Sequence, residues 1–326
     1  MTSRWTWHGG GLAAARAQFG EGRDPWIDLS TGINPLGWPR ILDIDIDWSR
    51  LPDEAALRAL EQAAAAHFGA DPAHVCAVPG TEIGLRLIGE QLDGPLFHRS
   101  PSYRTHGAMA PGARPIAAER LAEADGATLI LANPNNPDGV LLGESAMLDL
   151  LDRRGQGWLI VDEAFADTDP KPAMAAHVAE DRRLIVFRSF GKFFGLAGVR
   201  LGFVLGPSAM IAPLRARLGA WPLSAAAIAI GTAAYRDAAW IGATRMRLID
   251  AASALDGVLE EAGFAPRGAC PLFRLIEVED ATALFGQLAR RSILTRPFDA
   301  QPHWLRLGLP GDGQALARLA AALRGG

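Results

Sequence analysis

The stretch "SFGKFFGLAGVRLGF" (residues 189–203) decides the fold. Its lysine, Lys192, stands between a glycine and two phenylalanines, with Ser189 three residues before it and Arg200 eight residues after it. Up to residue 203 the only other lysine is Lys171, in a chain that uses arginine far more often. A solvated lysine does not need such apolar neighbours, whereas a lysine that forms a covalent imine does.

Composition sets the broad class. The chain has 326 residues, of which 49% are hydrophobic and 21% charged, enough for one large domain or two unequal ones. The net charge of −4 gives no basic surface for nucleic acid. Cys76 and Cys270 lie far apart without metal-ligand spacing, which predicts two reduced thiols and no metal site. No signal peptide is visible and the apolar stretches are too short for a bilayer, so we expect a cytoplasmic protein.

The middle of the chain alternates between two kinds of segment. Apolar runs rich in Val, Ile, Leu and Phe occupy 74–80, 127–134, 158–165, 183–190 and 198–206. Their continuous apolarity predicts strands buried on both faces, as in a mostly parallel sheet. Helical patterns at 81–92, 143–154 and 208–218 fall between some of these runs. Together they predict an α/β core.

The pattern changes near residue 238. A long helix over 238–262 precedes short strand-like and helical segments up to residue 324, which predicts a smaller α+β region. The first 45 residues show little periodicity and are expected to pack with this region. We therefore expect a large domain over 46–237 and a small domain made of 1–45 and 238–326, whose N-terminal segment acts as a lid.

Polar residues follow the apolar runs, where ligands bind in α/β sheets. Gly80 and Thr81 open a helix and could bind a phosphate, although an ordinary helix cap has the same pattern. A turn rich in Asn and Pro contains Asn136, and a plain turn is the alternative reading. Asp162 ends another apolar run, where a buried acid needs a cationic partner.

Six motifs occur in a fixed order: Gly-Thr, Pro-Ser-Tyr, Asn-Asn-Pro-x-Gly, Asp-x-Ala-Phe, Ser-Phe-x-Lys, and the arginine eight residues after the lysine. In this order they resemble the fold-type I pyridoxal phosphate enzymes of the class I/II aminotransferase superfamily, over nearly the whole chain. The resemblance implies a large domain with a mostly parallel sheet covered by helices, a smaller α+β domain, pyridoxal 5'-phosphate as cofactor, and a homodimer.

The resemblance also assigns roles to residues. Lys192 would hold the cofactor covalently, Asp162 would face its pyridine nitrogen and Tyr103 would stack on its ring, and these three form the expected catalytic set. His106 would lie behind Asp162, with a surface histidine as the alternative. The full expected cofactor-binding set is Gly80, Thr81, Glu82, Tyr103, His106, Asn136, Asp162, Ser189, Lys192 and Arg200.

The N-terminal sequences "WHGGGLAAARAQFG" and "WIDLSTGINPLGWP" are similar to the threonine-phosphate decarboxylases of cobalamin biosynthesis. Arg306 in "HWLRLGLP" matches the superfamily arginine that binds the substrate α-carboxylate, and a strand arginine in an ion pair is the alternative. The glycine-rich opening could also be a flexible terminus. The expected substrate-binding set is His8, Gly9, Asn34, Asn136 and Arg306.

The implied activity is pyridoxal-phosphate-dependent decarboxylation of L-threonine O-3-phosphate to (R)-1-amino-2-propanol O-2-phosphate. The alternative is a histidinol-phosphate or related aminotransferase, because the fold alone does not choose the reaction. A cofactor-sensing regulator of transcription is disfavoured by the slightly acidic charge. Two departures from the family pattern stand out: Phe165 replaces a frequent tyrosine, and residues 55–57 lack the tyrosine that reaches a neighbouring subunit's cofactor.

Overall fold

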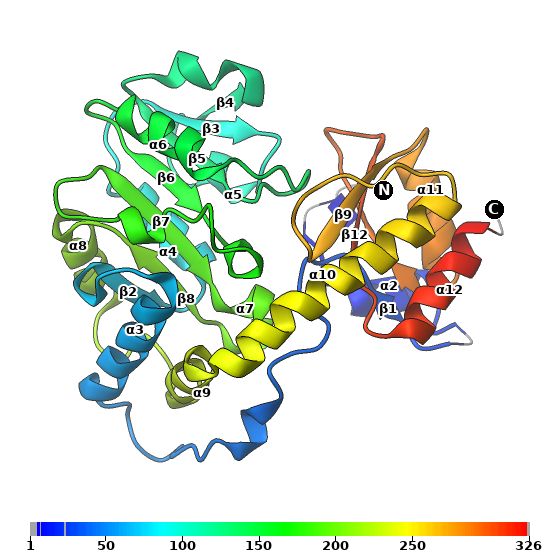
Figure 1. Cartoon of the computed structure of the whole chain (residues 1–326), viewed down its shortest axis with the longest axis horizontal. Coiled ribbons are helices and arrows are strands. Elements are labelled where there is room, and N and C mark those ends of the chain that lie inside the picture. Colours follow the sequence, from blue (N-terminus) through cyan, green and yellow to red (C-terminus); the bar gives the residue numbers. More distant parts are fainter. Residues whose placement is uncertain (1–4, 7, 23, 325–326) are drawn as a thin grey trace. The chain divides into compact units, whose positions relative to one another are not determined.

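The computed structural model of the chain describes residues 5–6, 8–22 and 24–324 (Figure 1). The chain divides into two compact units. The large unit holds Gly37–Asn136 and Val140–Ala243, and the small unit holds Met1–Leu36, Pro137–Gly139 and Thr244–Gly326 as far as these are described. The domain boundaries expected at 45/46 and 237/238 stay a prediction.

A seven-stranded sheet forms the centre of the large unit, in the order β2-β8-β7-β6-β5-β3-β4. Strand β8 runs antiparallel to both of its neighbours, and the other neighbouring strands are parallel. The strands are β2 (Val75–Val78), β3 (Leu96–Ser100), β4 (Arg114–Ala117), β5 (Thr128–Ala132), β6 (Leu159–Asp162), β7 (Leu184–Ser189) and β8 (Gly202–Leu205).

Every residue of β2 and of β5 to β8 is buried. Both faces of this sheet are therefore covered, as in other sheets that carry helices on both sides. On one face, apolar side chains of α4 and α8 pack on alternate residues of β2, β5, β6, β7 and β8. The helices of the unit are α3 (Glu54–Phe68), α4 (Thr81–Gly89), α5 (Thr105–Ala108), α6 (Glu144–Asp152), α7 (Phe190–Phe193), α8 (Ser208–Leu218) and α9 (Ala225–Arg236).

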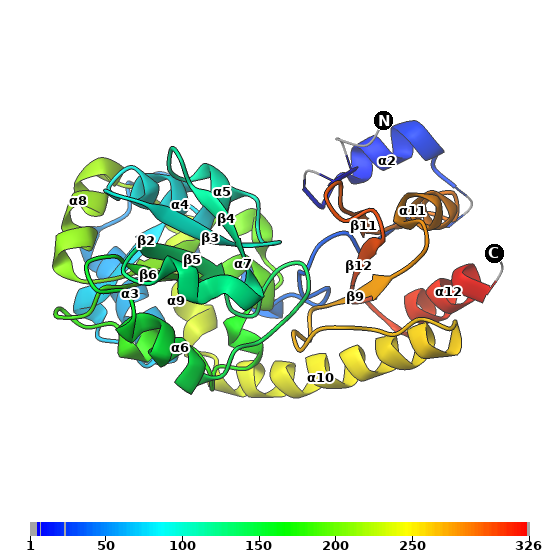
Figure 2. The same cartoon turned by 90° about the horizontal axis from the view of Figure 1, so that it is seen from above.

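The small unit contains a three-stranded antiparallel sheet in the order β11-β12-β9 (Figure 2). A short parallel pair joins β1 near the N-terminus to β10. The strands are β1 (Ile27–Asp28), β9 (Phe273–Glu277), β10 (Ile293–Leu294), β11 (Arg296–Pro297) and β12 (Trp304–Gly308). The helices are α2 (Leu12–Phe19), α11 (Ala281–Ala289) and α12 (Gly313–Arg324), while α10 (Ala238–Glu261) begins in the large unit.

The predicted α/β fold is confirmed, and each predicted run of the central sheet contains a strand. The sequence did not predict the strands β3 and β4, the helix α9 or the N-terminal helix α2. It also did not predict that β8 runs antiparallel. Within the described residues no helix is long and apolar enough to cross a membrane. The expected cytoplasmic location stays a prediction.

Candidate active site

Asp162 ends β6 and is buried in the large unit. Its Oδ2 lies 3.0 Å from Nε2 of His106, which donates because a carboxylate only accepts. Its Oδ1 accepts the Ala164 N–H at 3.0 Å. His106 lies on α5 and is fully buried, and its Nδ1 has no hydrogen-bond partner among the described residues. The carboxylate is thus held in one orientation at the carboxyl end of a central strand.

Glu82, in the first turn of α4, holds the aromatic candidate Tyr103. The Tyr103 hydroxyl donates to Glu82 Oε2 at 3.0 Å, and Thr105 Oγ1 donates to the same oxygen at 2.7 Å. Burial alone would raise the pKa of Glu82, but the hydrogen bonds from Thr105, Tyr103 and Arg86 lower it below its ordinary value. Burial raises the pKa of Tyr103 to about 12. Tyr103 is therefore a neutral donor, and Glu82 serves to orient it.

Gly80, Thr81 and Arg200 come together at the start of α4. Gly80 has a φ of +90°, and a Cβ on it would lie 2.6 Å from Nη2 of Arg200. Only glycine therefore leaves room for this guanidinium. A Cβ on Gly202 of β8 would lie 2.8 Å from Thr81 N, and Gly202 pairs with Ser189 across the sheet. The N-terminus of α4 and the guanidinium of Arg200 thus lie side by side, and donors of this kind suit a phosphate group.

Lys192 lies on the short helix α7 and is half-buried. Its Nζ lies 5.8 Å from the centroid of the Phe165 ring. The rings of Phe190 and Phe194 stack at 4.6 Å, and Phe194 stacks on Trp240 at 5.6 Å. The lysine therefore projects from a backbone fixed by aromatic packing. Asn136, also half-buried, follows the turn after β5.

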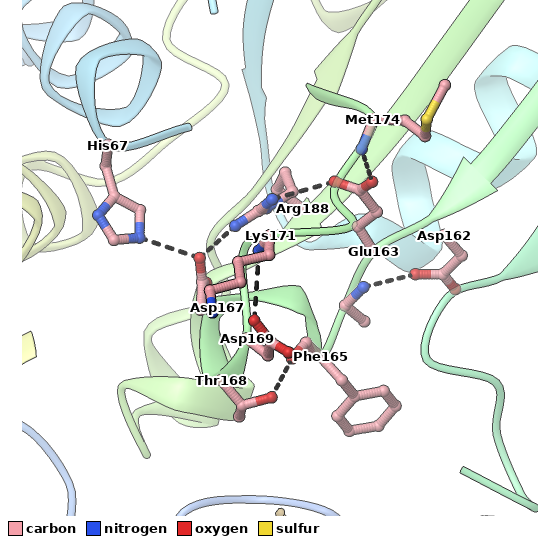
Figure 3. A network of polar contacts seen from close by, with 11 residues as sticks. His67, Asp162, Glu163, Phe165, Asp167, Thr168, Asp169, Lys171, Met174 and Arg188 are labelled. Carbon is pink, nitrogen blue, oxygen red and sulfur yellow. Dashed lines mark hydrogen bonds and ion pairs between the residues drawn. The ribbon is translucent and has the colours of Figure 1, made fainter. Parts of the chain in front are cut away.

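A buried ionic network lies beside these residues (Figure 3). Arg188, the residue before Ser189, pairs with Glu163 at 3.0 Å through Nη1 and with Asp167 through Nη2. His67 of α3 contacts Asp167 at 3.0 Å. Burial raises the pKa of Glu163, whereas Arg188 and His67 more than offset burial at Asp167 and hold its pKa far below its ordinary range. Sequence reasoning missed this network, although its carboxylates stand in the "DEAFAD" motif.

In the small unit, two buried arginines face each other across antiparallel strands. Arg306 of β12 pairs in register with Arg296 of β11. Arg306 Nη2 donates to the Ser30 carbonyl at 2.8 Å, and its Cζ lies 5.1 Å from the Phe273 ring centroid. Burial and the neighbouring charge of Arg296 lower the pKa of Arg306. Such a pair of cations suits an anionic ligand. Arg296 was missed, although a charged residue in the apolar run "ILTRPF" is a usable signal.

The N-terminal candidates lie on the same unit. Gly9 packs against Ser30, since a Cβ on it would lie 2.3 Å from the Ser30 carbonyl oxygen, the atom that also binds Arg306. Gly9 and Arg306 therefore both lie against the carbonyl group of Ser30. His8 is exposed, and buried Asn34 accepts the Leu36 N–H at 3.0 Å through Oδ1. The predicted substrate roles of these residues stay predictions.

The residues of the large unit fit the expected cofactor. Gly80 leaves space that a Cβ would fill, Arg200 and the α4 N-terminus supply anion donors, and Asp162 presents an oriented buried carboxylate. All ten residues of the expected cofactor-binding set belong to this unit. Except for Asn136, the expected substrate-binding residues belong to the small unit.

Comparison with known proteins identifies the family. A family model described as "Aminotransferase class I and II" matches residues 116–323. A threonine-phosphate decarboxylase of Sinorhizobium sp is 38% identical over 97% of this chain and 97% of the relative. One of Pseudomonas aeruginosa is 38% identical over 98% and 97%.

A solved structure is also similar. The histidinol-phosphate aminotransferase of Sinorhizobium meliloti in complex with pyridoxal-5'-phosphate is 22% identical, with a TM-score of 0.82 and coverage of 96% of this chain and 93% of that chain. It supports the fold. The family expected from the ordered motifs is confirmed: the chain belongs to the class I and II aminotransferases and, within them, to the threonine-phosphate decarboxylase family.

Proposed function

We propose that this chain is a pyridoxal-phosphate-dependent carboxy-lyase that converts L-threonine O-3-phosphate to (R)-1-amino-2-propanol O-2-phosphate. The observation that carries the proposal is 38% identity to two threonine-phosphate decarboxylases over nearly the full length of each chain. The pair of buried arginines in the small unit supports it, because this substrate carries two anionic groups.

The large unit holds the cofactor in this proposal. When bound, pyridoxal phosphate supplies an electron sink for the charge left on the α-carbon. Lys192 would hold the cofactor covalently, and once the substrate amine has taken its place, the freed lysine amine would be available to return a proton to that carbon. Asp162, oriented by His106 and Ala164, would face the pyridine nitrogen. Tyr103, held by Glu82, covers the ring.

The remaining cofactor contacts fix its two ends. Gly80, Thr81, Ser189 and Arg200 would hold the 5'-phosphate through N–H groups, hydroxyls and a guanidinium. Asn136 would donate to the phenolic oxygen. With both ends of the cofactor held, the position of the substrate groups would decide which bond to the α-carbon breaks, and a misplacement of about 1 Å costs about 10²-fold in rate.

The small unit binds the substrate in this proposal. Arg306 holds the α-carboxylate, with Arg296 on the neighbouring strand available to the second anion. Gly9, packed on Ser30, offers an N–H group near the same peptide. His8 and Asn34 are proposed as further contacts to the phosphate or the carboxylate.

Two incubations test the proposal against the alternative aminotransferase. Purified protein with L-threonine phosphate alone is expected to release carbon dioxide without any oxo-acid acceptor. Histidinol phosphate with 2-oxoglutarate is expected to give no glutamate. Glutamate in the second incubation without carbon dioxide in the first would assign the aminotransferase activity instead. Lys192→Ala is the control and is expected to be inactive in both, because the covalent anchor and proton carrier are gone.

We also propose that the chain forms a homodimer and acts in cobalamin biosynthesis, as the family resemblance implies. The large unit exposes several large apolar side chains, namely Leu42 (96%), Trp48 (76%), Leu51 (64%) and Trp221 (59%). Exposed apolar groups of this size suit a protein partner. Light scattering is expected to give twice the chain mass, and the double variant Trp48→Glu, Leu51→Glu is expected to give the single mass. A wild-type monomer would contradict the dimer.

A further inference from the structure

Arg188 joins the two ends of one loop of the large unit. Glu163 begins the loop that follows β6, and Asp167 ends it in the 3-10 helix Ala166–Thr168. One guanidinium binds both carboxylates (Figure 3). The Met174 N–H donates to the other oxygen of Glu163, and His67 contacts Asp167 from α3 at 3.0 Å. All four charged or titratable side chains of this network are at most 8% exposed.

The loop between these two carboxylates carries two groups of the candidate active site. The Ala164 N–H donates to Asp162 Oδ1 and thus sets the orientation of that carboxylate. The Phe165 ring lies 5.8 Å from Nζ of Lys192. A movement of residues 163–167 would therefore change the surroundings of both Asp162 and Lys192.

Strand β7 carries the guanidinium, and its next residue is Ser189, the proposed phosphate ligand. The backbone of β7 also accepts the Glu163 N–H at Phe187 O, at 2.9 Å. Arg188 therefore connects the loop after β6 to the strand end that leads into α7. As a source of stability alone a buried ion pair is poor, because desolvation offsets much of the attraction.

We propose that Arg188 is a positioning residue of the active site: by binding Glu163 and Asp167 it holds the 163–167 loop closed, and through Ala164 and Phe165 it orients Asp162 and the surroundings of Lys192. This inference rests on the proposed function, since it uses the assigned roles of Asp162 and Lys192. Arg188 itself touches neither substrate nor cofactor in this proposal.

The large unit offers a matched control. Arg154 is equally buried and also forms an ion pair, with its Nη2 2.9 Å from Asp125 Oδ1. Its other bonds go to backbone carbonyls, including Ala124 at 2.7 Å and Leu150 at 2.8 Å. These groups precede β5 or end α6, so they lie at the amino edge of the parallel strands. Asp162 and Ser189 lie at the carboxyl ends of β6 and β7, at the other edge of the sheet. Substitution of Arg154 therefore shows the effect of changing a buried arginine that does not contact the 163–167 loop.

The test compares Arg188→Lys and Asp167→Asn with Arg154→Lys and Asp125→Asn. A lysine binds one carboxylate and cannot reproduce the fork of arginine. For each variant three quantities are measured: the urea midpoint of the cofactor-free protein, the cofactor dissociation constant with its visible absorption spectrum, and kcat with KM. Asp167→Asn keeps the size of the side chain but removes its charge, and it serves if Arg188→Lys does not fold.

Arg188→Lys and Asp167→Asn are expected to lower kcat about 10- to 100-fold, as misplacement of a reacting group does, with KM within about twofold. The cofactor absorption band is expected to shift in both. Arg154→Lys and Asp125→Asn are expected to lower the urea midpoint while kcat and the spectrum stay those of the wild type. Wild-type kcat and spectrum in both loop variants, or equal losses in the controls, would overturn the proposal.

The spectrum separates this inference from the proposed function. A wild type that binds cofactor but releases no carbon dioxide would refute the proposed reaction. In that case a spectral shift confined to the two loop variants would still support the role of Arg188. A wild type that binds no cofactor would refute both.

Discussion

Replacing Arg306 with glutamine separates ligand binding from stability in the small unit. Arg306 is 2% exposed and lies opposite Arg296, and burial together with that second charge lowers its pKa. The ligand-free protein therefore maintains two buried cations side by side. Glutamine keeps much of the length and a donor for the Ser30 carbonyl, but it removes one of the two charges.

The expected magnitudes follow from these contacts. A guanidinium that binds a carboxylate with two charge-assisted hydrogen bonds contributes about 1.5–3 kcal/mol for each bond. Loss of both amounts to about 3–6 kcal/mol, or a decrease of about 10²- to 10⁴-fold in kcat/KM. The free energy of unfolding of the ligand-free variant is expected to change by less than about 1 kcal/mol, because the weakened bond to Ser30 is offset by relief of repulsion between the two arginines.

Arg274 on the neighbouring strand β9 provides the comparison. It forms a bidentate ion pair with Asp256, at 2.6 and 2.9 Å. Arg274→Gln breaks that pair and is expected to lower the free energy of unfolding by about 1–3 kcal/mol, the penalty for a poorly satisfied polar group. Its kcat/KM for L-threonine phosphate is expected to stay within about twofold of the wild type, since a structural pair adds no ligand contact.

The assay combines steady-state kinetics of carbon dioxide release with urea unfolding of the ligand-free proteins. An Arg306→Gln variant with wild-type kcat/KM would refute the carboxylate role. Equal losses of kcat/KM in both variants would refute it as well, because they would reflect damage to the β9-β12 sheet and not a lost ligand contact.

Three further predictions concern the large unit and the thiols. Asp162→Asn is expected to bind cofactor while turnover falls about 100-fold or more, because a charged acceptor becomes neutral; near-normal kcat would exclude this residue as the pyridine partner. Burial raises the pKa of Cys76 and Cys270 to about 12, so neither thiol should react with iodoacetamide at about pH 8 until urea is added, and labelled native protein would contradict this. The contribution of these two protonated thiols to the free energy of unfolding is complete below the pKa of an unfolded thiol, and it declines as the pH rises toward 12. Gly231→Ala of α9 would place a Cβ 2.5 and 2.8 Å from two leucine side chains, which costs about 1–3 kcal/mol. Gly242→Ala of α10 meets nothing within 4 Å and is expected to raise the urea midpoint, so a higher midpoint in the first variant would be inconsistent with this packing.

The central strands could be predicted because they are buried on both faces and thus read as continuous apolar runs. Strand β4 at the edge of the sheet and its neighbour β3 gave no such signal, since β3 contains His98 and Arg99 and β4 contains Pro115. Apolarity carries no information on strand direction, so the antiparallel course of β8 could not be read either. Helix α9 lies in an alanine-rich stretch whose almost continuous apolarity shows no clear helical periodicity.

Of the candidate site, sequence reasoning identified residues at the carboxyl ends of strands. Asp162 and Ser189 stand where two apolar runs end, and such positions meet at one edge of a sheet. The partners that orient them are harder to find. Arg188 and Asp167 are 21 residues apart, and their contact depends on how the loop after β6 folds back. Arg296 stands in an apolar run of the sequence, but its pairing with Arg306 follows from the register of β11 and β12.

The four-residue helix α7 has a thermodynamic consequence for Lys192. A helix of this length does not persist by itself, because nucleation costs more backbone freedom than its few hydrogen bonds return. Phe190, Phe193 and Phe194 are fully buried and impose its shape when the large unit folds. The entropy of ordering this backbone is thus lost during folding and not in each catalytic cycle. The four-carbon side chain of the lysine stays mobile, with about 2 kcal/mol of rotamer entropy. Each turnover therefore reorders only this side chain, while the backbone of α7 keeps its conformation.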